Sequence, residues 1–286
     1  MRMTLEDKAT EIGFTLYPRR SSRVQAINVT DLCFADDIAL LTNQLKQAKD
    51  LLQKLESEAM KVGLHVNTKK TELMAFNQTV VKTEVTSVNG DFIKQVENFK
   101  YLGGWLESSE HDVKIRIALA WSVCHRLLKI WKSSLSRKIR IRIFLATLES
   151  VLLYNCNTWT LINQLEKSLD GTYTRMLRMA LNISWKDHMP NEQLYGDLPP
   201  LSKKITTRRL KLAGHCVRHK EEISSNIVLW EPTRGRFRRG RKKKNYVDVL
   251  KENTGLENAQ EIKTAMMNRN LWNMIVHDAR PGGRPK

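Results

Sequence analysis

The sequence has little of what marks a secreted or membrane protein. Its 286 residues include only four cysteines, and no two of them form a Cys-x-x-Cys pair. Such scattered cysteines predict reduced thiols in an intracellular protein. No apolar run approaches the ~20 residues that span a bilayer, and residues 1–20 lack the apolar core of a signal peptide. We therefore expect no membrane-spanning segment and no membrane partner.

Acidic residues are also scarce. The chain carries 48 lysines and arginines against 30 aspartates and glutamates, which gives a formal net charge of +18. A chain this basic usually binds a polyanion, and nucleic acid is a better candidate than an anionic membrane surface. A hydrophobic content of 41% is enough for a core, and the length allows one large domain or two ordinary ones.

Two adjacent carboxylates, Asp36 and Asp37, stand between two short apolar runs. Val29 with residues 32–34 predicts one β-strand, and residues 38–41 predict the next. Ala35-Asp36-Asp37 would then form the tight turn of a hairpin. Two carboxylates in a turn are costly unless water or a cation such as Mg²⁺ compensates their charge. A plain solvated turn is the alternative, because aspartate is common in turns.

The segment after this hairpin predicts an amphipathic helix at residues 45–59. Thr42 or Asn43 could cap the helix, and Gly63 stands where a left-handed residue would end it. Further strands are predicted at residues 72–76, 80–88, 92–96 and 99–106. Asn89-Gly90 is a strong hairpin turn between the middle two.

From residue 107 the apolar spacing becomes helical. It predicts helices at residues 113–131, 139–152, 161–183 and 205–217, with an interruption expected at Gly171, and then two short helices at 246–252 and 260–279. Residues 234–244 are almost entirely arginine, lysine and glycine, and they predict an exposed, flexible basic linker. The fold class is therefore α+β, with regions 1–106, 107–200 and 201–286.

Three motifs follow one another in the first region. They are Phe34-Ala35-Asp36-Asp37, then Gly63-Leu64…Asn67…Lys70-Thr71, then Phe99-Lys100-Tyr101-Leu102-Gly103. Together they resemble the reverse transcriptase of non-LTR (LINE-type) retrotransposons, from its Asp-Asp motif onward. Later segments resemble the C-terminal region of the same elements, namely Trp131-Lys132, residues 154–159, Gly214-His215 and the basic run. The resemblance covers most of the chain from residue 28.

This resemblance implies a fold and a chemistry. Residues 1–106 would form part of a polymerase palm, built of antiparallel hairpins and a helix. Residues 107–200 would form an all-α thumb, and 201–286 a basic helical C-terminal region. The implied activity is RNA-directed DNA polymerisation by two-metal nucleotidyl transfer, with Mg²⁺ as cofactor and an RNA template and DNA primer as partners.

The resemblance also assigns roles to residues. Asp36 would be a direct Mg²⁺ ligand and Asp37 the neighbouring carboxylate of the same metal site. Lys70 would offset charge on the leaving group of the incoming triphosphate, or it is a solvated lysine. The primer grip would consist of Tyr101, Leu102, Gly103 and Gly104, which otherwise form an ordinary strand and turn.

Basic residues of the C-terminal region are candidates for nucleic-acid binding. The set comprises Arg208, Arg209, Lys211, Arg234, Arg236, Phe237, Arg238, Arg239, Arg241, Lys242, Lys243 and Lys244. Phe237 could stack on a base, and binding through phosphates should weaken steeply with salt. The run 234–244 is a phosphate-binding arm, a nuclear import signal, or both, and we expect a nuclear protein.

The sequence departs from the family pattern ahead of the hairpin. A two-metal site needs another aspartate from a separate strand, and the acids before Asp36 are Glu6, Asp7, Glu11 and Asp31. None of them opens an apolar strand, so we expect the C-terminal portion of a reverse transcriptase that does not polymerise alone. A missing N-terminal polypeptide would supply the rest of the palm. The alternative is a non-catalytic nucleic-acid-binding remnant, so whether the chain is an enzyme stays open.

His215, Cys216 and His219 raise a separate question. His215 and His219 lie one helical turn apart, and with Cys216 they could ligate zinc. No second cysteine pair lies nearby, and a helix face with incidental histidines is the alternative.

Overall fold

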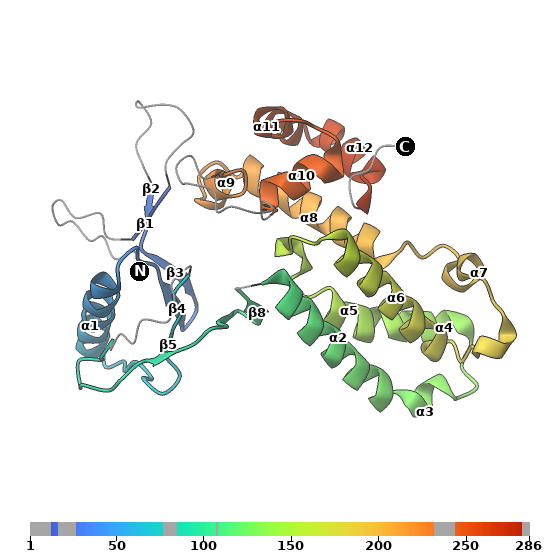
Figure 1. Ribbon diagram of the computed structural model, residues 1–286, viewed down its shortest axis with the longest axis horizontal. Helices are drawn as coiled ribbons and strands as arrows, with labels where there is room; N and C mark the ends of the chain where they lie inside the picture. The colour runs from blue at the N-terminus through green and yellow to red at the C-terminus, as the bar shows by residue number, and fades with distance from the viewer. Residues whose placement is uncertain (1–12, 17–26, 77–84, 107, 232–243, 282–286) are drawn as a thin grey trace. The chain divides into compact units, whose positions relative to one another are not determined.

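The computed structural model describes residues 13–16, 27–76, 85–106, 108–231 and 244–281. The described residues up to Leu102 form one compact unit, and those from Gly103 form a second. Short strands and one long helix make up the first unit, whereas helices dominate the second (Figure 1). The expected α+β class is therefore confirmed.

The first unit combines short strand pairs with one helix. Its elements are β1 (Phe14–Leu16), β2 (Ile27–Val29), β3 (Asp31–Phe34), β4 (Asp37–Leu40), α1 (Leu45–Lys61), β5 (Glu72–Leu73), β6 (Lys94–Gln95) and β7 (Lys100–Tyr101). β1 pairs with β2 and β3 with β4, both antiparallel, whereas β5 pairs with β6 in parallel. Leu52 of α1 packs with Val85 and Ile93 in a small core.

The ends of α1 test the expected caps. The N-cap is Gln44, without a side-chain cap, so the expected cap by Thr42 or Asn43 was wrong. The Asn43 amide instead donates to the Gly13 carbonyl at 2.8 Å, which ties the start of α1 to the residue before β1. Gly63 has φ +76°, and the expected left-handed end of the helix is confirmed.

The strand boundaries differ in part from those expected. Val29 belongs to β2, not to the strand of the Asp-Asp hairpin, because its cross-strand partner is Phe14 of β1. The Asn89-Gly90 turn is confirmed, with Gly90 at φ +85° and an antiparallel bridge between Thr86 and Phe92. Part of the strand expected at residues 80–88 lies outside the described residues.

The second unit is helical apart from β8 (Gly104–Trp105). Its α-helices are α2 (Ser109–Arg126), α3 (Leu128–Trp131), α4 (Arg137–Phe144), α5 (Ser150–Leu152), α6 (Asn163–Ala180), α7 (Asn191–Tyr195), α8 (Leu201–Arg218), α9 (Ser224–Ile227), α10 (Tyr246–Thr254), α11 (Ala259–Met267) and α12 (Arg269–Asp278). A π-helical segment, η1 (Leu145–Glu149), joins α4 to α5, and the 3₁₀ turns η2 (Cys156–Thr158) and η3 (Trp185–Asp187) occur between longer helices.

Two hydrophobic clusters form the core of this unit, and α8 belongs to both. Leu201 and Ile205 of α8 pack with α2 and α6 in the first cluster. Leu210 and Ala213 pack with α10, α11 and α12 in the second. Figure 1 shows α8 running between the two groups of helices. The N-terminal part of α8 thus packs in one cluster and its C-terminal part in the other.

Four of the expected helices differ from those observed, and the first is the helix expected at 113–131, which is divided into α2 and α3 at Leu127. Gly171 does not interrupt α6, because a single glycine in a long helix costs only ~1 kcal/mol. The helix expected at 260–279 is two helices, which meet at Asn268 in an extended conformation with its side chain capping α12. The helix expected at 139–152 contains the π-helical turn η1.

Candidate functional site

The Asp36-Asp37 pair lies at the end of the β3–β4 hairpin. Phe34 pairs with Asp37 across the strands, which leaves Ala35 and Asp36 as a two-residue turn. Ala35 has φ 53°, the positive value that a type II′ turn requires at its first central position. The hairpin itself is as expected, but the turn is one residue shorter because Asp37 already belongs to β4.

Both carboxylates of the pair are exposed. Neither forms an ion pair or a hydrogen bond with another described residue, so their charges are compensated by solvent or by a bound cation. Asp31 is engaged differently, since its carboxylate accepts hydrogen bonds from Thr30 Oγ1 at 2.7 Å and Cys33 Sγ at 3.2 Å. Alternation along the hairpin puts Asp31 on the face opposite Asp37.

The structure brings Tyr101 of the expected primer grip to this hairpin. Its phenol donates a hydrogen bond to the Leu32 carbonyl of β3 at 3.1 Å. Burial raises the pKa of Tyr101, and the charges of Cys33 and Asp37 raise that pKa further. Tyr101 therefore contacts the hairpin that carries the Asp-Asp pair, although it follows Leu32 by 69 residues in the sequence.

Leu102 and Gly103 follow Tyr101 as a tight turn. Their φ angles are 48° and 80°, the pattern of a type I′ turn. Glycine adopts a positive φ at no steric cost, whereas leucine is strained there by ~1–3 kcal/mol. A strained conformation at a non-glycine residue persists only where the surrounding structure fixes it. The backbone of Leu102 is therefore fixed by its surroundings.

A cluster of side chains in the second unit surrounds Gly103 and Gly104. The Arg116 guanidinium donates to the Gly103 carbonyl and lies 4.4 Å from the centre of the Tyr154 ring. A Cβ on Gly103 would come within 3.1 Å of that ring, and one on Gly104 would meet the Asn155 amide nitrogen at 2.0 Å. Only glycine fits at position 104 without movement of a neighbour.

Asp112 orients this arginine. It forms an i,i+4 ion pair with Arg116, with 3.5 Å between Oδ1 and Nε, and its Oδ2 accepts from the Trp159 indole at 2.7 Å. Both charged side chains are buried. Sequence reasoning missed Asp112 and Arg116, although their i,i+4 spacing was visible as a signal.

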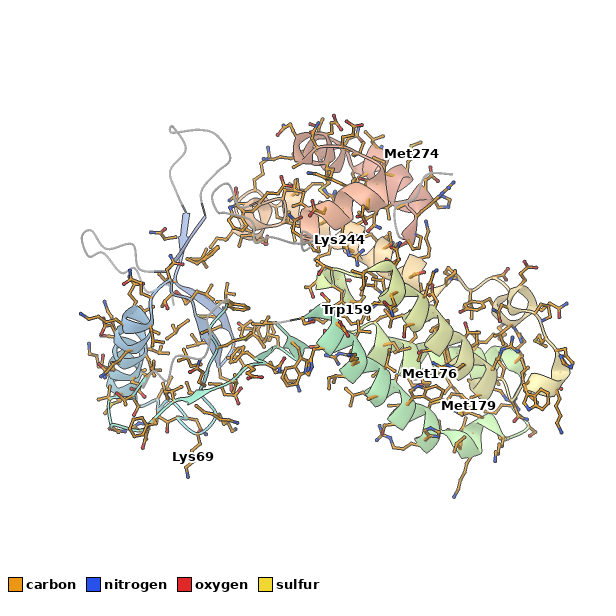
Figure 2. The ribbon with its side chains drawn as sticks, in the orientation of Figure 1. Lys69, Trp159, Met176, Met179, Lys244 and Met274 are labelled. Atoms are coloured by element: carbon orange, nitrogen blue, oxygen red, sulfur yellow. The ribbon has the colours of Figure 1, made fainter. Side chains whose placement is uncertain are left out.

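Lys70 lies in a turn organised by Asn67. The Asn67 side-chain oxygen accepts from the Lys70 amide at 3.2 Å, and its carbonyl accepts from the amides of Lys70 and Thr71. Lys70 is exposed, as is Lys69, which points away from this unit in Figure 2. No contact joins Lys70 to Asp36 or Asp37 among the described residues.

The basic candidates separate into exposed and engaged side chains. Arg208 and Lys211 on α8 are exposed. Arg209 is fully buried and donates to Asn253 Oδ1 and to the Trp159 carbonyl, both at 2.8 Å. Burial lowers the pKa of this guanidinium. The assignment of Arg209 to nucleic-acid binding is therefore wrong, because its donors bind protein inside the core.

Lys244 also departs from the expectation of a free basic arm. Its ammonium group forms an ion pair with Glu252 of α10 and lies 3.5 Å from the Leu161 carbonyl (Figure 2). The other members of the arm, from Arg234 to Lys243, lie outside the described residues.

The zinc hypothesis for His215, Cys216 and His219 gains no support. The rings of His215 and His219 are 4.2 Å apart, as expected one turn apart on α8. No group of three or more His, Cys, Asp or Glu side chains in the described ranges is arranged to hold a metal ion. All four cysteines carry free thiols.

Part of the sequence is similar to a known protein family. Residues 14–106 match the family model described as reverse transcriptase (RNA-dependent DNA polymerase). Residues 14–106 are therefore similar to reverse transcriptases, and we call them the reverse transcriptase segment. A transposon-derived protein of Caenorhabditis elegans is 24% identical over 272 residues, which cover 90% of this chain and 95% of the relative. No solved structure matches.

The reverse transcriptase segment contains the three ordered motifs of the first region, whereas the later segments of the resemblance lie outside it. Asp36, Asp37, Lys70 and the residues from Tyr101 to Gly104 all fall within residues 14–106. The similarity to the nematode protein extends beyond the segment into the helical unit, because it spans 272 residues. No helix among the described residues is long and apolar enough to cross a membrane.

Proposed function

We propose that the chain is the C-terminal portion of a non-LTR (LINE-type) reverse transcriptase. In this proposal the first unit is the later part of the palm, and the helical unit contains the thumb and a basic C-terminal region. The observation that carries the proposal is the Asp36-Asp37 turn. It lies in the segment of family similarity, and the Tyr101 hydroxyl donates a hydrogen bond to the same hairpin.

Asp36 and Asp37 are the residues that would hold Mg²⁺. Carboxylate oxygens suit this ion, and their exposure at the turn leaves room for substrate phosphates as further ligands. Bound there, two Mg²⁺ ions would activate a primer 3′-hydroxyl and offset the charge of the triphosphate. A complete site also needs a carboxylate from outside the described residues or from another polypeptide, so we expect no polymerisation by the chain alone.

The remaining candidates bind and orient nucleic acid. Lys70 presents an exposed ammonium group for a triphosphate, and the backbone of Leu102, Gly103 and Gly104 contacts the primer end. Arg116 and Asn155 act through these glycines by fixing their position. The basic run 234–244 binds phosphates and directs the chain to the nucleus.

A second candidate function is nucleic-acid binding without catalysis. The net charge of +18 favours this function, since it attracts template and primer whether or not the metal site is complete. Binding to a primer–template duplex should weaken steeply as the salt concentration rises.

Primer extension on an RNA template with Mg²⁺ tests both functions. The purified chain is compared with an Asp36→Asn, Asp37→Asn double variant and with Asp31→Asn. The last variant removes a carboxylate from the opposite face of the same hairpin. We expect salt-sensitive binding by all three proteins and no extension by any of them.

Other outcomes would change the proposal in defined ways. Extension that only the double variant loses would show that the chain polymerises by itself through the aspartate pair. Extension that survives in the double variant would contradict the role given to that pair. An absence of binding to primer–template would refute both functions.

A further inference from the structure

A basic pocket lies between α8 and α12 in the helical unit. It has a volume of about 230 Å³ and is lined by Lys211, His215, Arg218, Arg269, Trp272 and Asn273. The lining residues of α8 are spaced i, i+4, i+7 and those of α12 i, i+3, i+4. On each helix the lining residues therefore lie on a single face, which borders the pocket. Trp272 is buried at the base of the pocket, whereas Lys211, His215, Arg269 and Asn273 are exposed at its mouth.

The helices meet closely under this pocket. A Cβ on Gly214 would come within 2.3 Å of the Trp272 indole nitrogen, and that nitrogen donates to the Leu210 carbonyl at 3.0 Å. One nitrogen of Arg218 donates to the Met266 carbonyl at 2.9 Å, near the end of α11. The base of the pocket is therefore rigid, and Arg218 is held in place.

The charges at the pocket have the same sign. Three lining residues carry permanent positive charge, and no lining residue is acidic. Within the described part of the chain, neither Lys211 nor Arg269 forms an ion pair or a hydrogen bond. Positive side chains that converge without an acidic partner repel one another, and a bound anion removes that cost.

Arg269 lies at a helix end that disfavours its positive charge. Arg218 lies at the C-terminus of α8, where the helix dipole favours cations, so its charge has a structural reason. Arg269 is the first residue of α12, where the helix dipole disfavours a cation. A ligand anion would reverse this penalty, because both the arginine and the helix N-terminus attract negative charge.

The size of the pocket limits the ligand. Pockets for drug-sized molecules span about 300–1,000 Å³, so this pocket suits a single small group such as a phosphate. Trp272 is too deeply buried to stack on a base, and its indole N–H is already engaged. The geometry therefore favours recognition of a phosphate group without reading of sequence.

We propose that this pocket binds a backbone phosphate of a single nucleic-acid strand and gives the helical unit an anchoring point outside the reverse transcriptase segment. The inference rests on the proposed function only for the choice of nucleic acid as the source of the phosphate. Lys211 and Arg269 supply the charge at the mouth of the pocket, and Arg218 supplies it at the base.

The test compares two charge-matched double variants of the full chain. Lys211→Gln with Arg269→Gln removes the two charges at the mouth of the pocket. Lys220→Gln with Lys263→Gln removes two exposed charges from the same group of helices but outside the pocket. Fluorescence anisotropy measures the affinity of each protein for a labelled single-stranded RNA over a range of salt concentrations.

We expect the pocket variant to bind more weakly for all RNA sequences. The slope of log K against log salt should become shallower by about 0.7, the value for loss of one phosphate contact on a single strand. The control variant should keep the wild-type slope. Circular dichroism should show equal folding of both variants, because all four side chains are exposed.

Each other result overturns the inference. An equal loss of RNA affinity in both variants would mean that RNA binding depends on the total charge and not on the pocket. If the pocket variant loses binding to vesicles that contain phosphatidylserine but keeps its RNA affinity, the phosphate belongs to a lipid. A wild-type chain that binds no RNA at all would overturn this inference together with the proposed function, whereas the first two results leave that function standing.

Discussion

Replacing Gly104 by alanine would place a methyl group 2.0 Å from the Asn155 amide nitrogen and 2.8 Å from its Cγ. The backbone of Gly104 has an ordinary φ, so the alanine strains the structure only through this contact. Asn155 must rotate or the turn must move, and such overpacking costs about 1–3 kcal/mol. We expect Gly104→Ala to lower the free energy of unfolding of the helical unit by that amount.

Tryptophan fluorescence during urea unfolding measures this effect selectively. All seven tryptophans lie between residues 105 and 272, in the helical unit, so their signal reports on that unit and not on the first. With a urea slope of ~2–3 kcal/mol per M, the transition midpoint should fall by roughly 0.3–1.5 M.

Two further variants separate the contact from the loss of glycine. Gly171→Ala lies in α6 with nothing within 4 Å of the added methyl group, and it should stabilise the unit by about 0.5–1 kcal/mol. Asn155→Gly removes the obstructing side chain at a position with φ 59°, which glycine adopts freely. The double variant of Gly104→Ala with Asn155→Gly should recover stability relative to Gly104→Ala. Additive free energies of unfolding in this cycle would refute the reasoning.

Two more predictions concern buried groups. Arg209→Gln leaves two buried acceptors without their donors and should cost about 3–5 kcal/mol of stability, whereas Arg208→Gln, on the exposed neighbour, should change urea stability by less than about 0.5 kcal/mol. Burial raises the pKa of Tyr246 to about 12 from its ordinary 10.0. Its neutral form therefore contributes stability that is complete below pH 10 and lost as the pH rises to 12. Tyr246→Phe should have a shallower decline of urea midpoint over this window than wild type, and equal declines would contradict the assignment.

Local patterns predicted the elements that carry the site. The Asp36-Asp37 hairpin, the left-handed end of α1 at Gly63 and the Asn89-Gly90 turn each follow from a few neighbouring residues. Such signals are local because turns and caps are decided by backbone conformation at single positions. The parallel pairing of β5 with β6 has no such signal, since its partners are about twenty residues apart and its strands are two residues long.

The burial of Arg209 was missed although the sequence contained a signal. Ile205, Arg209, Ala213 and Val217 recur every four residues along α8, and all four are buried. An arginine in register with an apolar stripe faces the core and needs buried partners. Asn253 and the Trp159 carbonyl are those partners, and their distance along the chain kept them out of reach of sequence reasoning.

The π-helical turn η1 was missed for a similar reason. Glu149 at its end accepts a hydrogen bond from the Tyr173 hydroxyl at 2.6 Å and pairs with Lys204 of α8. A π-helical turn changes the direction of the side chains that follow it, and here it points a carboxylate at two partners on other helices. The periodicity of residues 139–152 contains no trace of partners that lie on α6 and α8.

The β3–β4 hairpin exposes apolar side chains, and the proposed metal site beside them requires a further carboxylate. β3 and β4 form a two-stranded sheet, and the side chains of Leu32, Phe34 and Ile38 are 41%, 62% and 42% exposed. Leu32 and Phe34 share one face of the hairpin, and Ile38 lies on the other. Burying Leu32 and Phe34 would stabilise the unit by about 2 kcal/mol, at roughly half of the full value for each side chain. A segment packed on the face of Leu32 and Phe34 would bury that surface and lie beside Asp37, which shares the face. We therefore expect one segment to supply both the carboxylate that completes the proposed metal site and the cover that this face lacks among the described residues.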